Sequence, residues 1–420
     1  MRFVLISILF FLGVLQLSAQ QPSDTIDTVT YIQPDKIVLN TTDESLINIS
    51  LNTIGNEQYL APFFAQLSSL EKKKQTTVSA AHIGDSHIQA DMLTEVVRTG
   101  LQQTFGNAGR GLVFPYKAAH TNEPDNYKSS TNVKWEVHKI VNKQAFNNGI
   151  SGICMRTIDS AASIVFSIAN RPGLDYSFKK VTLFMNKNVN SFDVSITNVR
   201  DSVLKTISSQ DTNKSAFLVS TKLDSFYNSI KIKPLISNVC QHSALYYGFR
   251  FERDCPGLFY DAIGINGATF GNYLYDSFFT QLASTNPQLI IVSLGTNDVY
   301  TAAFNETAFE NNFCNFISML KRYMPNASVI ITTPPDCYRN RKYRLKSLQT
   351  VRDIIIRECN MNHFAYWDFY SIMGGYGSMQ KWFLKGYSAK DKIHFSAKGY
   401  RLQGYLLLKA LLNSYKNYGK

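Results

Sequence analysis

A change of rhythm partway along the chain constrains the fold more than any other feature. Residues 257–420 alternate apolar runs with amphipathic stretches, such as LIIVSL at 289–294 and the helical pattern that stops at Pro325. Residues 119–256 contain instead a series of short β-type runs, such as KVTLFMN and FDVSITNV, separated by Asn, Gly, Pro and Ser. Strands that alternate with helices predict a mainly parallel sheet covered on both faces. Evenly spaced short strands without helices predict an antiparallel sandwich.

The α/β rhythm is also present before the β-rich segment. TTVSAAHIGD is a β-prone run of small residues, and after Ser86 apolar residues recur at the spacing of one helix that ends at Gly106. A chain of 420 residues also exceeds what one compact core usually covers. We therefore expect a three-layer α/β/α domain built from residues 20–118 and 257–420, interrupted by a β-sandwich over residues 119–256.

The first residues are typical of a secretory signal peptide. Arg2 precedes a largely apolar run over residues 3–15, and a Leu-Ser-Ala exit ends at Ala19. The apolar run is short for a membrane span, and no stop-transfer charges follow it. No other stretch of the sequence resembles a span. We expect residues 1–19 to be removed and the protein to be exported, to the periplasm, the cell surface or the medium.

The charge balance points to an anionic partner. The formal net charge is +12, which favours contact with cell-wall glycans, acidic polysaccharides or lipid headgroups. Because the lysines are dispersed and the chain is expected to be exported, we do not expect it to bind nucleic acid.

The cysteines leave several arrangements open. Export permits disulfides, and Cys240 with Cys255 is the most plausible pair because the two flank one β-like segment. The six cysteines allow 15 pairings, however, and spacing alone does not choose among them. No CxxC motif or His/Cys cluster has the spacing of zinc ligands, so we expect no structural metal.

Four short blocks carry polar residues at predicted strand ends or loops. Ser86 in GDSH, Gly267 in INGA and Asn297 in GTND each follow a predicted strand, where open α/β sheets place ligands. Asp391 and His394 in DKIH are three apart, which lets a carboxylate reach the imidazole. Taken alone, each block has an ordinary explanation: a helix cap, a β-turn, a capping residue and a surface pair.

In this order, the four blocks resemble the SGNH (GDSL-type) hydrolase family. The residues that name the family correspond to Ser86, Gly267, Asn297 and His394, and the resemblance covers the α/β portion. His87 replaces the Leu of the usual GDSL motif. This histidine, the segment FGNAGRGLVFPY and the β-rich insertion between the first two blocks look like peptidoglycan O-acetylesterases. On this resemblance we interpret the insertion as a carbohydrate-binding-like module.

The resemblance implies a catalytic triad. Ser86 would be the nucleophile, His394 its general base, and Asp391 the group that orients His394. The backbone N–H groups of Ser86 and Gly267 and the side-chain amide of Asn297 would form the oxyanion hole. This chemistry requires no metal and no organic cofactor.

Other polar and aromatic residues near the blocks have two interpretations each. His87 could contact substrate or support the site with a hydrogen bond, and Arg110 could contact a glycan or brace its loop. Trp382 and Tyr387 could stack on a sugar, although packing in the core is favoured.

The sequence therefore predicts an exported serine esterase that removes O-acetyl groups from peptidoglycan or another polysaccharide. A lipase or thioesterase of the same family is the enzymatic alternative, and a non-catalytic glycan-binding surface protein is the other. The five intact site residues argue against the second alternative. The sugar, the acyl group and the oligomeric state stay open.

Overall fold

A computed structural model describes residues 41–72, 77–142, 146–210, 215–300 and 303–418. The predicted signal peptide, residues 1–19, lies outside the described residues. Among the described helices, none is both long and apolar enough to cross a membrane.

The α/β part is organised around a six-stranded sheet. All neighbouring strands in it are parallel except the edge pair β1–β19, which is antiparallel. The strand order is β1 (Ile54–Gly55), β19 (Ala365–Trp367), β16 (Ser328–Thr332), β15 (Leu289–Ser293), β2 (Thr77–Gly84) and β14 (Gly257–Gly264).

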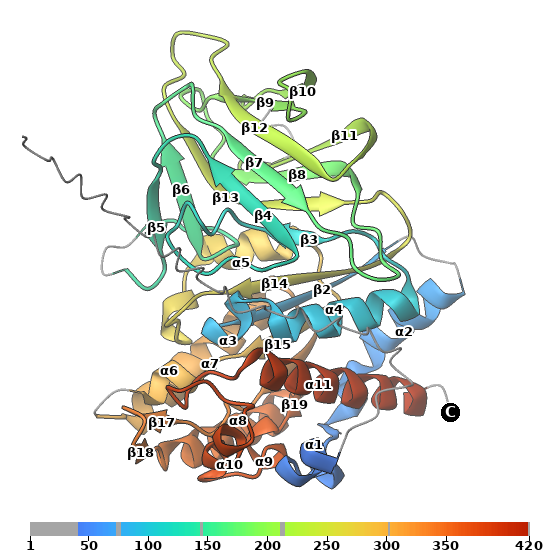
Figure 1. Ribbon diagram of the computed structural model, residues 1–420, viewed down its shortest axis with the longest axis vertical. Helices are drawn as coiled ribbons and strands as arrows, with labels where there is room; N and C mark the ends of the chain where they lie inside the picture. The colour runs from blue at the N-terminus through green and yellow to red at the C-terminus, as the bar shows by residue number, and fades with distance from the viewer. Residues whose placement is uncertain (1–40, 73–76, 143–145, 211–214, 301–302, 419–420) are drawn as a thin grey trace, which may run out of the picture. The chain divides into compact units, whose positions relative to one another are not determined.

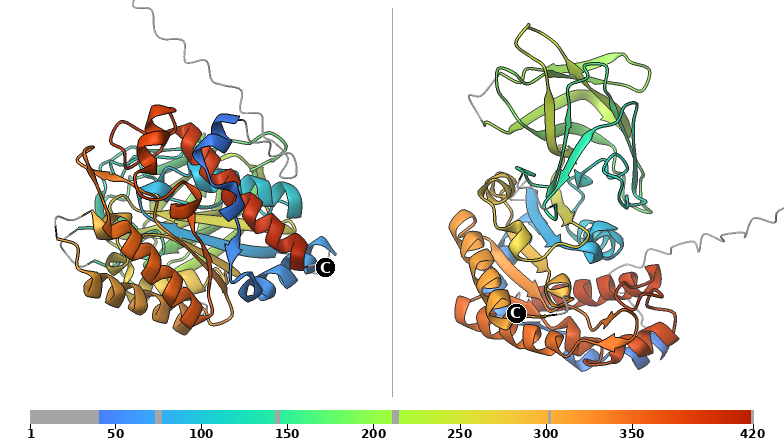
Figure 2. Two further views of the ribbon diagram at one scale, coloured as in Figure 1. Left: turned by 90° about the horizontal axis from the view of Figure 1, so that it is seen from below. Right: turned by 90° about the vertical axis from the view of Figure 1, so that its left-hand side faces the viewer.

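Helices cover both faces of this sheet (Figures 1 and 2). One face carries α2 (Ala61–Glu71), α4 (Met92–Phe105) and α11 (Ala397–Tyr418). The other face carries α5 (Asp276–Ala283), α7 (Glu306–Tyr323) and α8 (Ser347–Asn362). Short helices occupy the connections: α1 (Thr41–Leu46), α3 (Ser86–Gln89), α6 (Thr296–Val299), α9 (Phe369–Ile372), α10 (Ser378–Leu384), and the 3-10 turns Ile49–Leu51, Glu57–Leu60 and Gly271–Tyr273.

Strand β15 shows why its sequence is an unbroken apolar run. Successive side chains of a strand point to opposite faces. Ile290 and Val292 pack in the core that contains α7 and α8, whereas Leu289 and Ile291 pack in the core that contains α4 and α11, and all four are fully buried. A strand covered on both faces needs an apolar residue at every position.

Two antiparallel sheets form the β-rich part. The first contains β10 (Val203–Ile207), β9 (Asp193–Thr197), β12 (Ser229–Leu235), β7 (Ile164–Ile168) and β4 (Tyr127–Thr131). The second contains β11 (Leu218–Tyr227), β8 (Phe178–Met185), β13 (Ala244–Glu252), β6 (Ile153–Thr157) and β5 (Glu136–Lys139), with β3 (Gly111–Val113) added beside β13. Phe166 of the first sheet packs against Phe249 and Phe251 of the second, with ring centroids 5.0 and 5.3 Å away. The predicted fold class, a three-layer α/β domain with an all-β sandwich inserted, is confirmed.

The predicted division into domains stays a prediction. The expected boundary after residue 118 falls between β3 and β4, yet β3 pairs with β13 of the sandwich through Leu112 and Arg250. Strand β14 follows β13 after a turn of only a few residues. The two parts therefore share backbone hydrogen bonds beyond the expected boundary.

The single helix expected after Ser86 is wrong: there are two, α3 and α4. Asp91 separates them, with a φ of 60° that an α-helix does not allow. The buried carboxylate accepts hydrogen bonds from Arg98 at 2.6 and 2.9 Å and from Arg110 at 2.8 Å. Although burial opposes ionisation, these two guanidinium groups hold the pKa of Asp91 well below its usual value. These hydrogen bonds hold Asp91 in the conformation that separates α3 from α4. The spacing of hydrophobic residues in the sequence does not reveal this separation.

The expected pairing of Cys240 with Cys255 is also wrong. All six cysteines are free thiols. Cys240 precedes β13 and Cys255 follows it, so the nine residues of that strand stand between them. At about 3.3 Å per residue, the strand separates the two thiols far beyond the reach of a disulfide.

Candidate active site

Ser86 is presented by a tight turn between β2 and α3. A Cβ on Gly84 would lie 2.8 Å from the backbone oxygen of Ser293, so the last residue of β2 has room only for glycine. Asp85 follows and caps α3, because its Oδ1 accepts a 2.9 Å hydrogen bond from the backbone N–H of His87. Ser86 is the first residue of α3 and is half-buried.

His394 joins Ser86 to Asp391. The Oγ of Ser86 lies 2.8 Å from Nε2 of His394, and Nδ1 of His394 lies 2.8 Å from Oδ2 of Asp391. A carboxylate accepts only, so Nδ1 carries the hydrogen, and Nε2 is left to accept the hydroxyl hydrogen of Ser86. The three side chains form a continuous chain of hydrogen bonds from a hydroxyl to a carboxylate.

The local turn holds Asp391 in its ionised form. Its Oδ1 accepts backbone hydrogen bonds from Ile393 at 2.9 Å and from His394 at 3.0 Å. Partial burial opposes ionisation, but the bonds from His394 and the backbone amides lower the pKa of Asp391 below its ordinary value. The spacing of three residues therefore lets one carboxylate both fix the loop and orient the imidazole.

Gly267 and Asn297 lie beside the same turn. Gly267 has a φ of 83°, and a Cβ added there would meet no atom within 4 Å. The Nδ2 group of Asn297 donates to Oδ2 of Asp85 at 3.1 Å and to the backbone oxygen of Ala268 at 3.0 Å. Asn297 thus ties the residue before Ser86 to the residue after Gly267, and the structure brings all four predicted blocks together.

Two carboxyl groups lie next to these residues, Asp85 fully buried and Asp298 half-buried. Burial raises the pKa of Asp85, which is fully shielded from solvent, to about 7. Burial likewise raises the pKa of Asp298 to about 7, although its Oδ1 accepts from the backbone N–H of Phe270 at 3.3 Å. Neither carboxyl forms part of the hydrogen-bonded chain from Ser86 to Asp391.

His87 is buried beside His394. It is 5% exposed, its Nδ1 lies 3.0 Å from the hydroxyl of Tyr400, and its ring centroid lies 5.5 Å from that of His394. Burial lowers the pKa of His87 to about 3, so the ring stays neutral at ordinary pH. Of its two predicted roles, the structure places His87 in the supporting one.

Arg110 braces its loop. It is 2% exposed, and it donates to Asp91 at 2.8 Å, to the side chain of Asn126 at 2.9 Å and to the backbone oxygen of Leu112 at 3.2 Å. This burial leaves the guanidinium no access to a glycan. Trp382 and Tyr387 are both fully buried, so they belong to the core.

Sequence reasoning missed Gln89 as a support of the glycine turn. Its Oε1 accepts from the backbone N–H of Asn266 at 2.8 Å, and its Nε2 donates to Thr121 at 2.6 Å. The partners of Gln89 are far from it in the sequence, so no local motif marks it. Among the described residues, no group of three or more His, Cys, Asp or Glu side chains is arranged to hold a metal ion.

Residues 233–402 match the GDSL-like Lipase/Acylhydrolase family. The match contains Gly267, Asn297, Asp391 and His394 and begins after Ser86, beyond most of the β-rich insertion. The chain therefore contains a domain of the GDSL-like lipase/acylhydrolase family, as the motif order predicted. No curated protein sequence matches the chain significantly.

Solved structures share the fold. A structure described as "Peptidoglycan O-acetylesterase in action, 5 min" is 22% identical, with a TM-score of 0.71 over 85% of this chain and 96% of that chain. At this identity the likeness shows the fold, including the inserted β-rich part.

Two smaller structures overlap only in part. A GDSL-like lipase from Bacteroides thetaiotaomicron is 20% identical, with a TM-score of 0.29 over 37% of this chain and 76% of that chain. A carbohydrate esterase of family 3 from Talaromyces cellulolyticus is 16% identical, with a TM-score of 0.30 over 37% of this chain and 72% of that chain.

Proposed function

We propose that the protein is an exported serine esterase that removes O-acetyl groups from peptidoglycan or another polysaccharide. The observation that carries the proposal is the hydrogen-bonded chain from Ser86 through His394 to Asp391. A serine hydroxyl bonded to a neutral imidazole, which is itself oriented by a carboxylate, is the arrangement that activates serine as a nucleophile.

The first half-reaction forms an acyl-enzyme. As Oγ of Ser86 attacks the ester carbonyl carbon, Nε2 of His394 takes the hydroxyl proton, and Asp391 stabilises the imidazolium. Collapse of the tetrahedral intermediate breaks the ester bond. The sugar oxygen leaves with the proton from His394, and the acetyl group stays on Ser86.

The second half-reaction restores the enzyme. Water attacks the acetyl carbonyl while Nε2 of His394 accepts one of its protons. When the bond to Oγ breaks, that proton returns to Ser86 and acetate is released. In both halves, the oxyanion is held by the backbone N–H groups of Ser86 and Gly267. Both hydrogens of the Asn297 amide already have acceptors, Asp85 and Ala268, so this amide holds the oxyanion by sharing one of them.

Three features support the substrate and the compartment. The fold is shared with a protein described as a peptidoglycan O-acetylesterase. The formal net charge of +12 favours an anionic polymer, and the first nineteen residues have the pattern of a signal peptide. We assign residues 119–256 to a carbohydrate-binding-like domain and residues 20–118 with 257–420 to the hydrolase domain.

Replacement of the nucleophile tests the proposal. Ser86→Ala is expected to abolish acetate release from O-acetylated peptidoglycan, measured by an enzymatic acetate assay, without changing the circular dichroism spectrum. Ser225→Ala, on the exposed surface of β11, is the matched control and should retain full activity. Acetate release by Ser86→Ala at the unmodified rate would refute the assignment. Faster turnover of long-chain than of acetyl esters would favour a lipase instead.

A further inference from the structure

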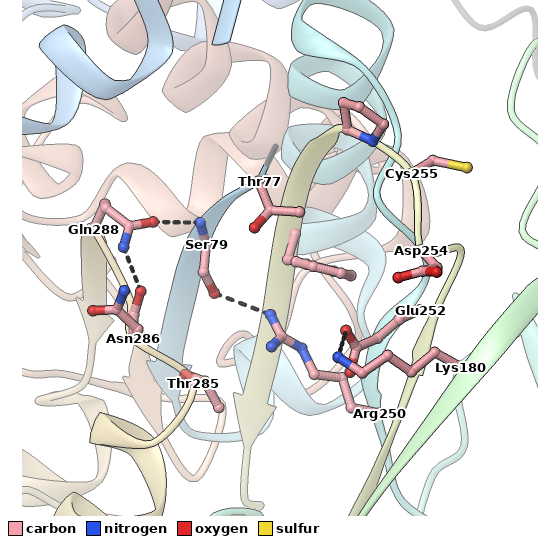
Figure 3. Close-up of a pocket in the computed structure, with 12 residues that line it drawn as sticks. Thr77, Ser79, Lys180, Arg250, Glu252, Asp254, Cys255, Thr285, Asn286 and Gln288 are labelled. Atoms are coloured by element: carbon pink, nitrogen blue, oxygen red, sulfur yellow. Dashed lines mark hydrogen bonds and ion pairs between the residues drawn. The ribbon is translucent and has the colours of Figure 1, made fainter. Parts of the chain in front are cut away.

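A polar cavity lies at the opposite end of the parallel sheet from Ser86. Its volume is about 460 Å³, and it adjoins the amino ends of β2, β14 and β15, where Thr77, Pro256 and Gln288 lie (Figure 3). Ser86, by contrast, follows the carboxyl end of β2. Strands β8 and β13 of the sandwich supply the facing wall, so both parts of the chain build this cavity.

Two cationic and two anionic side chains line it. Lys180 of β8 donates to Oε2 of Glu252 at 2.9 Å, and the two side chains are 29% and 9% exposed. Arg250 lies with its guanidinium carbon 4.0 Å from the ring centre of Phe259 and donates to Oγ of Ser79 at 3.0 Å. Asp254, the second anionic residue, is at the rim.

The charges of these four side chains cancel. Arg250 is committed to the sheet, because it also pairs with the buried Asp261 at 3.2 Å. Lys180 has three N–H donors and directs one to Glu252, which leaves donors for a ligand. Asp254 is 37% exposed and pairs with Lys222 on the outside at 2.8 Å. The cavity therefore offers a donor of positive charge beside acceptors of negative charge.

We propose that this cavity binds a zwitterionic ligand, one that carries an ammonium and a carboxylate together, as in a free amino acid or a short peptide. The ligand carboxylate faces the free donors of Lys180, and the ligand ammonium faces Glu252 and Asp254. A neutral pair of charges preserves the balance of the lining. A ligand with one charge would leave that charge uncompensated in a confined polar site, which is costly.

A neighbouring hollow gives a longer ligand room to extend. It has a volume of about 390 Å³ and shares Asn286 and Gln288 with the first cavity. Tyr323 and Pro325 line its far side. A short peptide anchored at Lys180 would pass along Asn286 into this hollow, whereas a free amino acid would occupy the charged cavity alone.

Calorimetric titration of the full-length protein with four small probes tests the charge requirement. L-Alanine and L-alanyl-L-alanine carry both charges, N-acetyl-L-alanine carries only the carboxylate, and L-alaninamide carries only the ammonium. We expect both zwitterions to bind and each singly charged probe to bind about 10-fold more weakly or worse, as loss of one charge-assisted contact implies. Tighter binding of the dipeptide identifies a peptide as the ligand, and tighter binding of alanine identifies a free amino acid. No saturable binding of either zwitterion, or equal binding of the singly charged probes, overturns the proposal.

Variants locate the binding. Lys180→Gln should weaken both zwitterions about 10-fold or more. Lys179→Gln is the matched control, because successive strand residues point to opposite faces and Lys179 lies over the ring of Phe226. Asp254→Asn leaves the pair of Lys180 with Glu252 in place, so it provides a second test if Lys180→Gln does not fold. Unchanged affinity in Asp254→Asn and in a folded Lys180→Gln would exclude this cavity. Turnover of a small acetyl ester should be the same in all three, since none touches the residues around Ser86.

Discussion

The carboxylate of Asp85 accepts a hydrogen bond of 3.1 Å from the side-chain amide of Asn297, across 212 positions of sequence. The same carboxylate caps α3 through the backbone N–H of His87. One buried group thus sets both the turn that presents Ser86 and the direction of the amide proposed to hold the oxyanion.

Asp85→Asn should therefore impair turnover more than substrate binding. The side-chain NH2 group introduced at position 85 faces the NH2 group of Asn297, and two donors repel each other. The amide of Asn297 therefore turns away from the oxyanion. We expect kcat to fall about 10- to 100-fold, with little change in KM. Steady-state kinetics on a small acetyl ester would measure this. Asp298→Asn is the control, and an equal loss in both variants would contradict a specific role for Asp85.

Two glycines in one connection should respond differently to alanine. At Gly264, a Cβ would lie 2.2 Å from the backbone nitrogen of Gln89, so the backbone must shift. At Gly267, an added Cβ would have no atom within 4 Å, so only the backbone φ of 83° disfavours alanine. We expect Gly267→Ala to lower the free energy of unfolding by about 1 kcal/mol and Gly264→Ala by about 3 kcal/mol or more. Urea denaturation would measure both, and equal losses would contradict the geometry.

Asp298 should make the protein less stable as the pH rises. Burial raises the pKa of this carboxyl to about 7 in the folded state, above the value of about 3.9 in an unfolded chain. The folded state then holds the proton more tightly, so its contribution is full below pH 4 and is lost as the pH rises toward 7. Asp298→Asn should nearly match the unmodified protein at pH 4 and be more stable by about 4 kcal/mol at pH 8, because each unit of pKa difference is worth about 1.4 kcal/mol. A constant difference between the two pH values would contradict this.

Arg110→Met should affect stability and leave substrate affinity unchanged. It leaves Asp91 and Asn126 buried with fewer partners, and we expect the free energy of unfolding to fall by about 3 kcal/mol. Arg156→Met, which breaks an exposed pair with Glu136, should change it by less than about 1 kcal/mol. A large rise in KM for Arg110→Met without loss of stability would instead indicate contact with substrate.

The parts that the sequence predicted well are those in which local pattern and tertiary burial agree. The apolar run over β15 is buried on both faces. Asp391 and His394 contact each other within one loop, so their spacing in the sequence already carries the geometry. Ser86, Gly267 and Asn297 belong to blocks whose order in the chain indicates the family, and the structure brings these blocks together.

The parts that were missed depend on contacts between distant segments. The break at Asp91 is set by Arg98 and Arg110, and hydrophobic periodicity contains no signal for a buried carboxylate. Cys240 and Cys255 flank one β-like segment, but that segment is an extended strand, which separates residues as far as a chain allows.

The pairing of β2 with β14 has a consequence for how the enzyme assembles. The two strands are neighbours over their whole length, from Thr77 beside Gly257 to Gly84 beside Gly264, yet every strand of the sandwich lies between them in the chain. Closing so long a loop lowers the conformational entropy of the chain, and the native contacts between the two parts must offset this loss. During synthesis β2 must wait for β14, and then for the loop that carries His394, before the proposed triad can form. An incomplete chain thus holds Ser86 without the imidazole proposed to activate it.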